Sequence, residues 1–317
     1  MIALTCKHEK KTKHGKNRNG SQRWKCKSCK ATVSDVHVPT GPLGNMEADP
    51  TKVFMALEML AEGSGVRAVS RITGLDRKTI TKAILLVGEK CERFHYEMVQ
   101  NVKVDFCEID EQWQYIAGHE KIRATTTLKG YVGDCWSYYG LCATSKMILS
   151  FEHGRRTKET TDAFLTKLRR SIDGRCQITS DGYPGYKHAV PMKFLSDVDY
   201  AVLIKRYKNE QIEKRYAPAA INSVERIAQF GNPDMSRCST SYIERFNLTV
   251  RTKLKRWNRL TIGYSKNVEA HCCMFAIFAC LYCFKTVHST IKTTPAISCG
   301  VTDRKWTLQE ICEKVGA

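Results

Sequence analysis

The spacing of apolar residues along the chain changes near residue 100. Before that point, from Lys52 to about His95, apolar residues recur with the period of an amphipathic helix. This pattern predicts three helices, over residues 51–63, 66–74 and 77–94. A short helix, a turn at Gly74 and a longer helix are typical of a helix-turn-helix unit.

After Gln100 apolar and polar residues alternate, as they do in β-strands. Strands are predicted over residues 102–110, 135–143, 146–153, 176–181 and 200–207. An amphipathic helix is predicted over 157–172, and the chain from Tyr242 to about His288 is predicted to be largely helical. Three strands, a helix, a fourth strand and further helices are typical of a mixed α/β domain of the ribonuclease-H type.

The first 35 residues hold few apolar side chains, so this segment cannot build a core and needs another means of stabilisation. The prolines and glycines that follow are typical of a linker. The predicted domains are a zinc-ribbon DNA-binding module (1–35), a linker (36–50), an all-α helix-turn-helix DNA-binding domain (51–98) and a ribonuclease-H-like α/β core (99–317).

The chain is strongly basic, with 51 Lys and Arg against 32 Asp and Glu, a net charge of +19 and a pI near 9.3. Such an excess favours a polyanionic partner, either nucleic acid or an anionic membrane surface, although basic ribosomal or chaperone-like proteins share it. The longest apolar run, Cys272–Phe284, has 13 residues, which is too short to span a bilayer and predicts a buried helix. The N-terminus becomes polar too early for a signal peptide, so we expect a protein without a membrane partner.

The 15 cysteines are odd in number, scattered and often placed within apolar stretches, as Cys280 and Cys283 are. This distribution favours core thiols in a reducing cytosol over a disulfide framework.

A minority of the cysteines have the spacing of a metal site. Cys26 and Cys29 are separated by two residues, as in a zinc knuckle, and Cys6 and His8 would complete a closed structural Zn²⁺ site. His14 is the substitute if His8 is not a ligand. The alternative is a disordered basic arm with incidental thiols.

In the helix-turn-helix segment, certain apolar positions suit two helices packed over a turn: Val69, Ile72, Leu75, Ile80 and Ile84. The second helix would present its polar first turns to the major groove of DNA. The residues concerned are Asp76, Arg77, Lys78, Thr79 and Lys82. Any three-helix bundle would share much of this pattern.

Three carboxylates are candidates for a catalytic site. Asp110 is predicted to end the first strand, Asp181 the fourth, and Glu244 to begin a basic helix. In a ribonuclease-H order the first and fourth strands are adjacent, so Asp110 and Asp181 would meet, with Glu244 on a helix packed across that edge. Three acids around one point cannot all ionise without cations, and Mg²⁺ (or Mn²⁺) suits such oxygen ligands.

Two such ions about 4 Å apart can activate a water or a 3′-hydroxyl at a phosphorus atom. Each acid also has an ordinary explanation. Asp181 could cap a turn, Asp110 could be an edge acid beside Glu111, and Glu244 could be an acid of a first helical turn.

The helix that begins near Glu244 is otherwise basic. Glu244, Asn247 and Arg251 share one face, and Arg245 lies one position round. A metal-binding carboxylate inside a phosphate-binding helix suits nuclease or strand-transfer chemistry on DNA.

Several motifs resemble the transposases of bacterial insertion sequence one: "DEQW", "GRR" at Gly154–Arg156, "TSDGYPGY", "STSYIERFNLTVR", "LTIGYSKNVEAH" and the closing "TTPAISCGVTDRKWTLQEI". The resemblance covers nearly the whole chain. The first zinc knuckle departs from the family's usual Cys-x-x-Cys, because it is "CKHE" here.

The resemblance implies a metal-dependent transposase with Asp110, Asp181 and Glu244 as its DDE triad. It would bind the terminal inverted repeats of its insertion sequence, cleave the 3′ ends and join them to target DNA. Its partners would be double-stranded DNA, at element ends and target, and a second copy of the chain, in the bacterial cytoplasm at the nucleoid. Residues that would hold DNA or support the site are Arg155, Arg156, Arg245, Asn247, Arg251, Ser265, Lys266 and His271.

Two alternatives stay open from the sequence. A nuclease of the same fold would cut DNA without strand transfer, and a regulator derived from a transposase would bind DNA without cutting it. A lost triad acid would favour the regulator, and all three acids are present.

Overall fold

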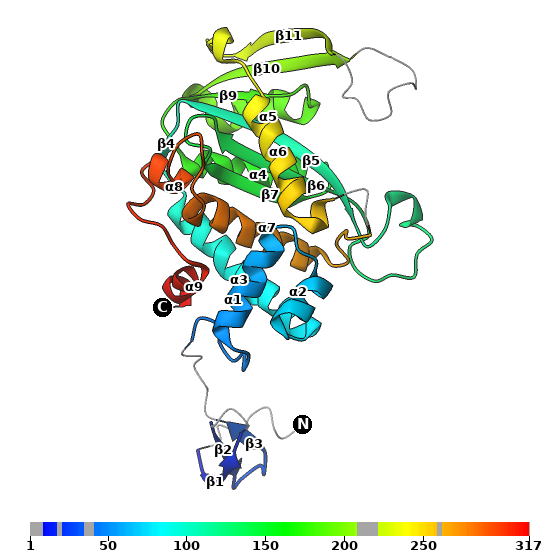
Figure 1. Cartoon of the computed structure of the whole chain (residues 1–317), viewed down its shortest axis with the longest axis vertical. Coiled ribbons are helices and arrows are strands. Elements are labelled where there is room, and N and C mark those ends of the chain that lie inside the picture. Colours follow the sequence, from blue (N-terminus) through cyan, green and yellow to red (C-terminus); the bar gives the residue numbers. More distant parts are fainter. Residues whose placement is uncertain (1–8, 18–20, 35–40, 208–220, 259–261, 317) are drawn as a thin grey trace. The chain divides into compact units, whose positions relative to one another are not determined.

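The computed structural model describes residues 9–17, 21–34, 41–207, 221–258 and 262–316 (Figure 1). The chain divides into two compact units, Met1–Pro50 and Thr51–Ala317. The domain boundaries given above stay predictions.

The first unit contains a small antiparallel sheet. Its strands are β1 (Lys11–Lys16), β2 (Gln22–Cys26) and β3 (Thr32–Ser34), in that order. β2 pairs with both neighbours, and Cys26 at its end is buried whereas every residue of β1 is exposed. Because so few side chains of this sheet are apolar and buried, the sheet has almost no hydrophobic core.

The second unit is built on a six-stranded mixed sheet in the order β11-β10-β9-β5-β6-β7 (Figure 1). The strands are β5 (Phe106–Ile116), β6 (Gly133–Cys142), β7 (Ile148–Gly154), β9 (Cys176–Ser180), β10 (Val198–Tyr207) and β11 (Ile221–Phe230). β9 is parallel to β5 and to β10, and the remaining pairs are antiparallel. The predicted mixed α/β class is confirmed, and the first and fourth predicted strands, β5 and β9, are neighbours.

Helices cover both faces of this sheet. The adjacent residues Tyr138 and Tyr139 of β6 point to opposite faces because side chains alternate along a strand. Tyr138 contacts Phe164 of α4 (Lys158–Ser171) and Tyr186 of α5 (Pro184–Phe194). Tyr139 contacts Phe246 of α6 (Ser241–Lys253) and stacks on Phe275 of α7 (Val268–Cys280). The sheet is therefore the middle of three layers.

The predicted helices before residue 100 are α1 (Pro50–Ala61), α2 (Val66–Thr73) and α3 (Arg77–Met98). Gly74 ends α2 with a φ of 73°, and the Asp76 side chain caps α3 by accepting a hydrogen bond from the Lys78 amide. Val69, Ile80 and Ile84 are buried as predicted. The prediction for Ile72 was wrong, because its side chain lies on the outer face of α2 and is 66% exposed.

α3 packs along α7 in the second unit, and Gly88 of α3 lies against Cys273 of α7. The stretch Val268–Lys285 is long and apolar enough to cross a membrane by length and composition alone, but 72% of it is buried inside the fold. The predicted buried helix is confirmed.

Shorter elements complete the described chain. They are β4 (Val102–Lys103), β8 (Ile172–Asp173), α8 (Pro295–Ser298), α9 (Leu308–Gly316), the 3₁₀ turns η1 (Glu120–Ile122), η2 (Leu195–Asp197), η3 (Met235–Arg237) and η4 (Lys255–Trp257), and the π-helical turn η5 (Leu281–Lys285).

Candidate active site

Asp110 and Asp181 lie side by side because of the register between β5 and β9. The last parallel pair is Ile109 with Ser180, so the next residue on each strand is one of the two aspartates. β9 ends at Ser180, one residue before the predicted end at Asp181, whereas β5 continues to Ile116 against β6 alone. The prediction that Asp110 ends its strand was therefore wrong: it lies within β5, at the point where pairing to β9 stops.

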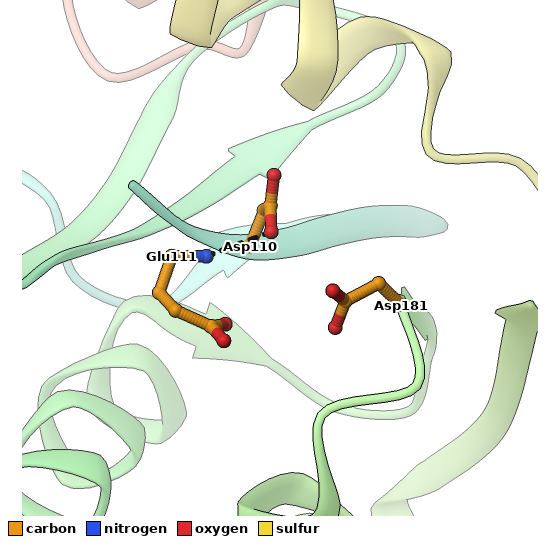
Figure 2. A group of neighbouring side chains, drawn as sticks. All are labelled: Asp110, Glu111 and Asp181. Atoms are coloured by element: carbon orange, nitrogen blue, oxygen red, sulfur yellow. Dashed lines mark hydrogen bonds between the residues drawn. The ribbon is translucent and has the colours of Figure 1, made fainter. Parts of the chain in front are cut away.

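A third carboxylate, Glu111, joins these two (Figure 2). One carboxylate oxygen from each of Asp110, Glu111 and Asp181 lies within 4.8 Å of the others, and among the described residues this group could hold a metal ion. Figure 2 shows Glu111 and Asp110 on opposite sides of β5, with the carboxylate of Asp181 pointing towards both. In the sequence analysis Glu111 was named only as the acid beside Asp110 and was not predicted to be part of the site.

Glu244 lies in the first turn of α6 and faces the same place. Asp110, Asp181 and Glu244 line one cavity of about 200 Å³, together with Lys205 and Thr240. Glu244 accepts a 2.7 Å hydrogen bond from the Thr240 hydroxyl and forms an ion pair with Lys205. The structure thus brings together the three acids predicted from the sequence.

Burial shapes the charge of this site. It raises the pKa of Asp110 to about 7, with a further contribution from the negative charge of Asp181. Burial and Asp181 likewise raise the pKa of Glu111 to about 8, although the neighbouring Arg156 guanidinium opposes the shift. Both carboxyls would ionise more readily beside a cation.

The residues present fit a hard divalent cation. Carboxylate oxygens are the ligands that Mg²⁺ and Mn²⁺ prefer. One of them, Oε2 of Glu111, is buried without a hydrogen-bond partner in the described part of the chain. An uncompensated buried oxygen of this kind is costly, and a cation would offset that cost.

Asn247 supports Asp110. Its side-chain amide Nδ2 donates a 2.6 Å hydrogen bond to Oδ2 of Asp110, and its backbone carbonyl accepts one of 2.9 Å from Gln112. Asn247 is 8% exposed. Of the two roles that the resemblance implies, holding DNA or supporting the site, the position of Asn247 fits the second.

Glu108 is a residue that the sequence analysis missed. It lies two positions before Asp110 on the same face of β5, and its buried carboxylate accepts a 2.8 Å hydrogen bond from the Ile243 amide at the start of α6. Glu108 thereby ties the helix that carries Glu244 to the strand that carries Asp110. The alternation in "CEIDEQW" could have indicated it, because Glu108 and Asp110 are two positions apart and side chains at that spacing lie on the same face of a strand.

His271 and Ser265 are fully buried. Nδ1 of His271 lies 2.8 Å from the Ser265 hydroxyl, and its ring stacks on Trp257 with centroids 3.7 Å apart. Burial lowers the pKa of His271 well below its ordinary value. A neutral buried ring fits a supporting role and not direct contact with DNA.

The other predicted DNA-binding residues are placed as follows. On the first turns of α3, exposed side chains are those of Arg77, Lys78 and Lys82, and Thr79 is partly buried. Elsewhere Arg245 and Lys266 are exposed, and Arg251 is partly buried. Arg155 forms an ion pair with Glu120, and Arg156 forms one with Glu111. The guanidinium of Arg156 also lies between the rings of Trp136 and Tyr183, at 4.5 and 4.1 Å from their centroids. Arg156 is therefore tied to the acidic cluster rather than free on the surface.

Two of the predicted zinc ligands, Cys6 and His8, lie outside the described residues. Cys26 ends β2 and Cys29 lies on the turn that follows, where the Lys30 amide donates a 3.1 Å hydrogen bond to the Cys26 carbonyl. His14 is exposed in β1. The two cysteines thus flank one tight turn, and the Zn²⁺ site stays a prediction.

Fold and site together define a mixed α/β protein with an acidic centre suited to a divalent cation. Residues 229–284, which include Glu244 and Asn247, match the family model described as IS1 transposase. The chain is also similar to the insertion element iso-IS1n protein InsB of Shigella dysenteriae, with 26% identity over 165 residues, which cover 52% of this chain and 86% of that protein. The resemblance to insertion sequence one transposases is confirmed, and these matches support a transposase.

Among solved structures, the chain is similar to a piggyBac transposase in a synaptic complex with hairpin DNA, with a TM-score of 0.41, 11% identity and coverage of 85% of this chain and 70% of that one. It is also similar to the C-terminal lobe of a budding yeast Argonaute, with a TM-score of 0.23, 5% identity and coverage of 66% and 56%. At these scores neither likeness bears on function.

The raised pKa values of Asp110 and Glu111 predict how stability depends on pH without metal. Both carboxyls hold their proton more tightly in the folded chain, so their contribution to stability is full below about pH 4 and is lost as the pH rises through about 7 and about 8. In EDTA we expect the melting temperature to fall on the order of 5 °C between about pH 7 and pH 8.5. Thermal unfolding at both pH values measures this.

Asp181→Asn is the comparison, because the charge of Asp181 contributes to both shifts. We expect a smaller fall in this variant. Equal falls in the two proteins would show that Asp181 does not act on its neighbours.

Proposed function

We propose that this protein is a DNA transposase that binds the terminal inverted repeats of its insertion sequence, cleaves their 3′ ends and joins them to target DNA. The observation that carries the proposal is the convergence of Asp110, Asp181 and Glu244 on one cavity. The match of residues 229–284 to the IS1 transposase family supports it, because that segment contains Glu244.

The core proposed for this reaction is ribonuclease-H-like. The adjacency of β5 and β9, with antiparallel β6 and β7 beyond β5, supports this assignment.

Asp110, Asp181 and Glu244 would hold Mg²⁺ or Mn²⁺. When bound, such ions activate a water or a 3′-hydroxyl and stabilise the leaving oxygen at a phosphorus. Asn247 orients Asp110 through the amide hydrogen bond to Oδ2. Lys205 brings a positive charge to the same cavity, which suits a phosphate oxygen of the scissile strand.

DNA would be held by cations outside this cavity. Arg77, Lys78 and Lys82 at the start of α3 are exposed and free to enter a groove, and Arg245 is exposed on the second turn of α6. A structural Zn²⁺ would brace the N-terminal ribbon as a further DNA-binding module. Two element ends must be held together for joining, so the active form would be at least a dimer on DNA, at the nucleoid.

The test is a Mg²⁺-dependent cleavage and joining assay on DNA carrying the flanking inverted repeats, with Asp181→Asn beside the wild type. Joined products that disappear in the variant are the expected result. Cleavage without joining would indicate a nuclease, and binding with neither would indicate a regulator.

A further inference from the structure

A second cavity, of about 710 Å³, lies where α6 ends, whereas the acids lie where α6 begins. Most of its lining comes from three segments of the second unit, which are the turn into α2, the segment that follows α6 and the loop that precedes α7, and Leu60 of α1 and Met274 of α7 complete it. Its lining residues include Gly65, Arg67, Lys255, Arg256, Tyr264 and Lys266. We call this cavity the basic groove.

The groove has cations but no carboxylates. Arg67, Lys255, Arg256 and Lys266 line it, and no Asp or Glu is among its lining residues. Lys266 places its ammonium group 3.1 Å from the ring centroid of Tyr264. None of the four cations forms an ion pair with a carboxylate in the part of the chain that the structure describes.

Several other basic side chains of the fold are paired with carboxylates. Lys205, Lys253 and Arg156 each pair with a glutamate. Arg256 is partly buried, and burial lowers the pKa of its guanidinium. A cation withdrawn from water without a partner is costly, and an anion in the groove would offset that cost.

The start of α2 adds a second kind of anion-binding group. Gly65 is its N-cap residue and has no side chain to cap the helix. The first amides of a helix carry partial positive charge and bind phosphate when no side chain occupies them. A Cβ added at Gly65 would meet nothing within 4 Å, so there is open space beside this residue at the start of the helix.

The groove is also at a useful distance from the acids. Glu244 and Leu254, which lines the groove, are ten residues apart in sequence at the two ends of α6. At 1.5 Å per residue this is about 15 Å along the helix axis. For a duplex that lies along α6, with the phosphates of one strand about 3.4 Å apart along the duplex axis, the separation is about four to five phosphates.

We propose that the basic groove binds the phosphate backbone of DNA, about four to five phosphates from the strand end held at the acids. Binding in the groove rests on its own charges and cavity; only the distance from the strand end rests on the proposed function. Arg67, Lys255, Arg256 and Lys266 contact phosphate oxygens, and the amides at the start of α2 hold one of them.

The test uses the full chain and fluorescence anisotropy with a short labelled DNA duplex of arbitrary sequence, because backbone contacts carry no sequence information. Arg67→Gln/Lys255→Gln removes two exposed charges of the groove. We expect affinity to fall on the order of tenfold, and the slope of log K against log salt to decrease by about two. The matched control is Lys103→Gln/Lys305→Gln, which removes two exposed charges elsewhere.

A double variant that binds as tightly as its control, with an unchanged salt slope, would overturn the proposal. An RNA duplex bound more tightly than DNA, and equally affected, would overturn the commitment to DNA. Neither readout requires cleavage. A protein that fails to cut DNA can therefore still show binding in the basic groove, and a protein that cuts DNA can still fail this test of the groove.

Gly65→Asp separates lost binding from lost folding. Aspartate is a favourable N-cap residue and the backbone at Gly65, with φ −85° and ψ 149°, already suits it. We expect an unchanged or higher melting temperature together with a loss of DNA affinity on the order of tenfold, since the carboxylate occupies the phosphate position. Wild-type affinity in this variant would overturn the role given to α2.

Discussion

Glu244→Gln is expected to lower the rate of DNA cleavage at least about a thousandfold while DNA binding stays within a few-fold. The amide keeps the size of the side chain and an oxygen for Lys205 and Thr240, both of which contact the native carboxylate. It loses the negative charge that a divalent cation requires. Cleavage rates on DNA with inverted repeats, and anisotropy on the same DNA, measure the two quantities.

Glu62→Gln is the matched control. Glu62 is also exposed and also forms an ion pair with a lysine, Lys253 of α6, but it lies outside the cavity of the acids. We expect wild-type cleavage in this variant. Full cleavage activity in Glu244→Gln would show that Glu244 is not a metal ligand of the catalytic site.

Gly88→Ala is expected to lower the free energy of unfolding by about 2–3 kcal/mol, because it overpacks a close contact between α3 and α7. A methyl group at Gly88 would lie 2.6 Å from Cα of Cys273 and 2.7 Å from its carbonyl oxygen. Backbone atoms cannot rotate away as a side chain can, so the two helices must separate. Urea unfolding followed by circular dichroism measures the change.

Gly65→Ala provides the control for the substitution itself. Its Cβ would meet nothing within 4 Å, and its φ of −85° is ordinary for alanine. Because alanine is a poorer N-cap residue than glycine, we expect a loss of about 0.5–1 kcal/mol, well below the loss at Gly88. Equal losses at the two positions would show that α3 and α7 do not pack as closely as the structure has them.

The sequence predicted those elements whose apolar pattern is set by burial. β5, β6, β7 and β9 alternate or are continuously apolar because helices cover both faces of the sheet. The bounds of β6, β7 and β9 were predicted to within about two residues, whereas β5 begins and ends several residues later than predicted. β11 was missed because it is an edge strand with mostly exposed residues. α5 was missed because Pro191 lies inside it and Pro184 opens it, and prolines usually indicate a turn in a sequence.

The candidate site was predicted in part for a related reason. Asp110 and Asp181 could be placed together because strand order decides which strand ends meet. The sequence could not place Glu111 in the site, because alternation along the strand puts its side chain on the opposite face of β5 from that of Asp110. The two carboxylates belong to one group only because the Asp181 side chain lies close to both (Figure 2). Likewise, the pattern of α2 did not indicate that Ile72 lies on its exposed face.

The proposed function requires that Asp110, Asp181 and Glu244 hold divalent cations for chemistry on DNA. The most direct measurement is anomalous X-ray scattering from crystals of the full chain grown with Mn²⁺. We expect a peak in direct contact with carboxylate oxygens of Asp110 and Asp181 that disappears in Asp181→Asn. Ordered carboxylates in the wild type with no peak between them would contradict it.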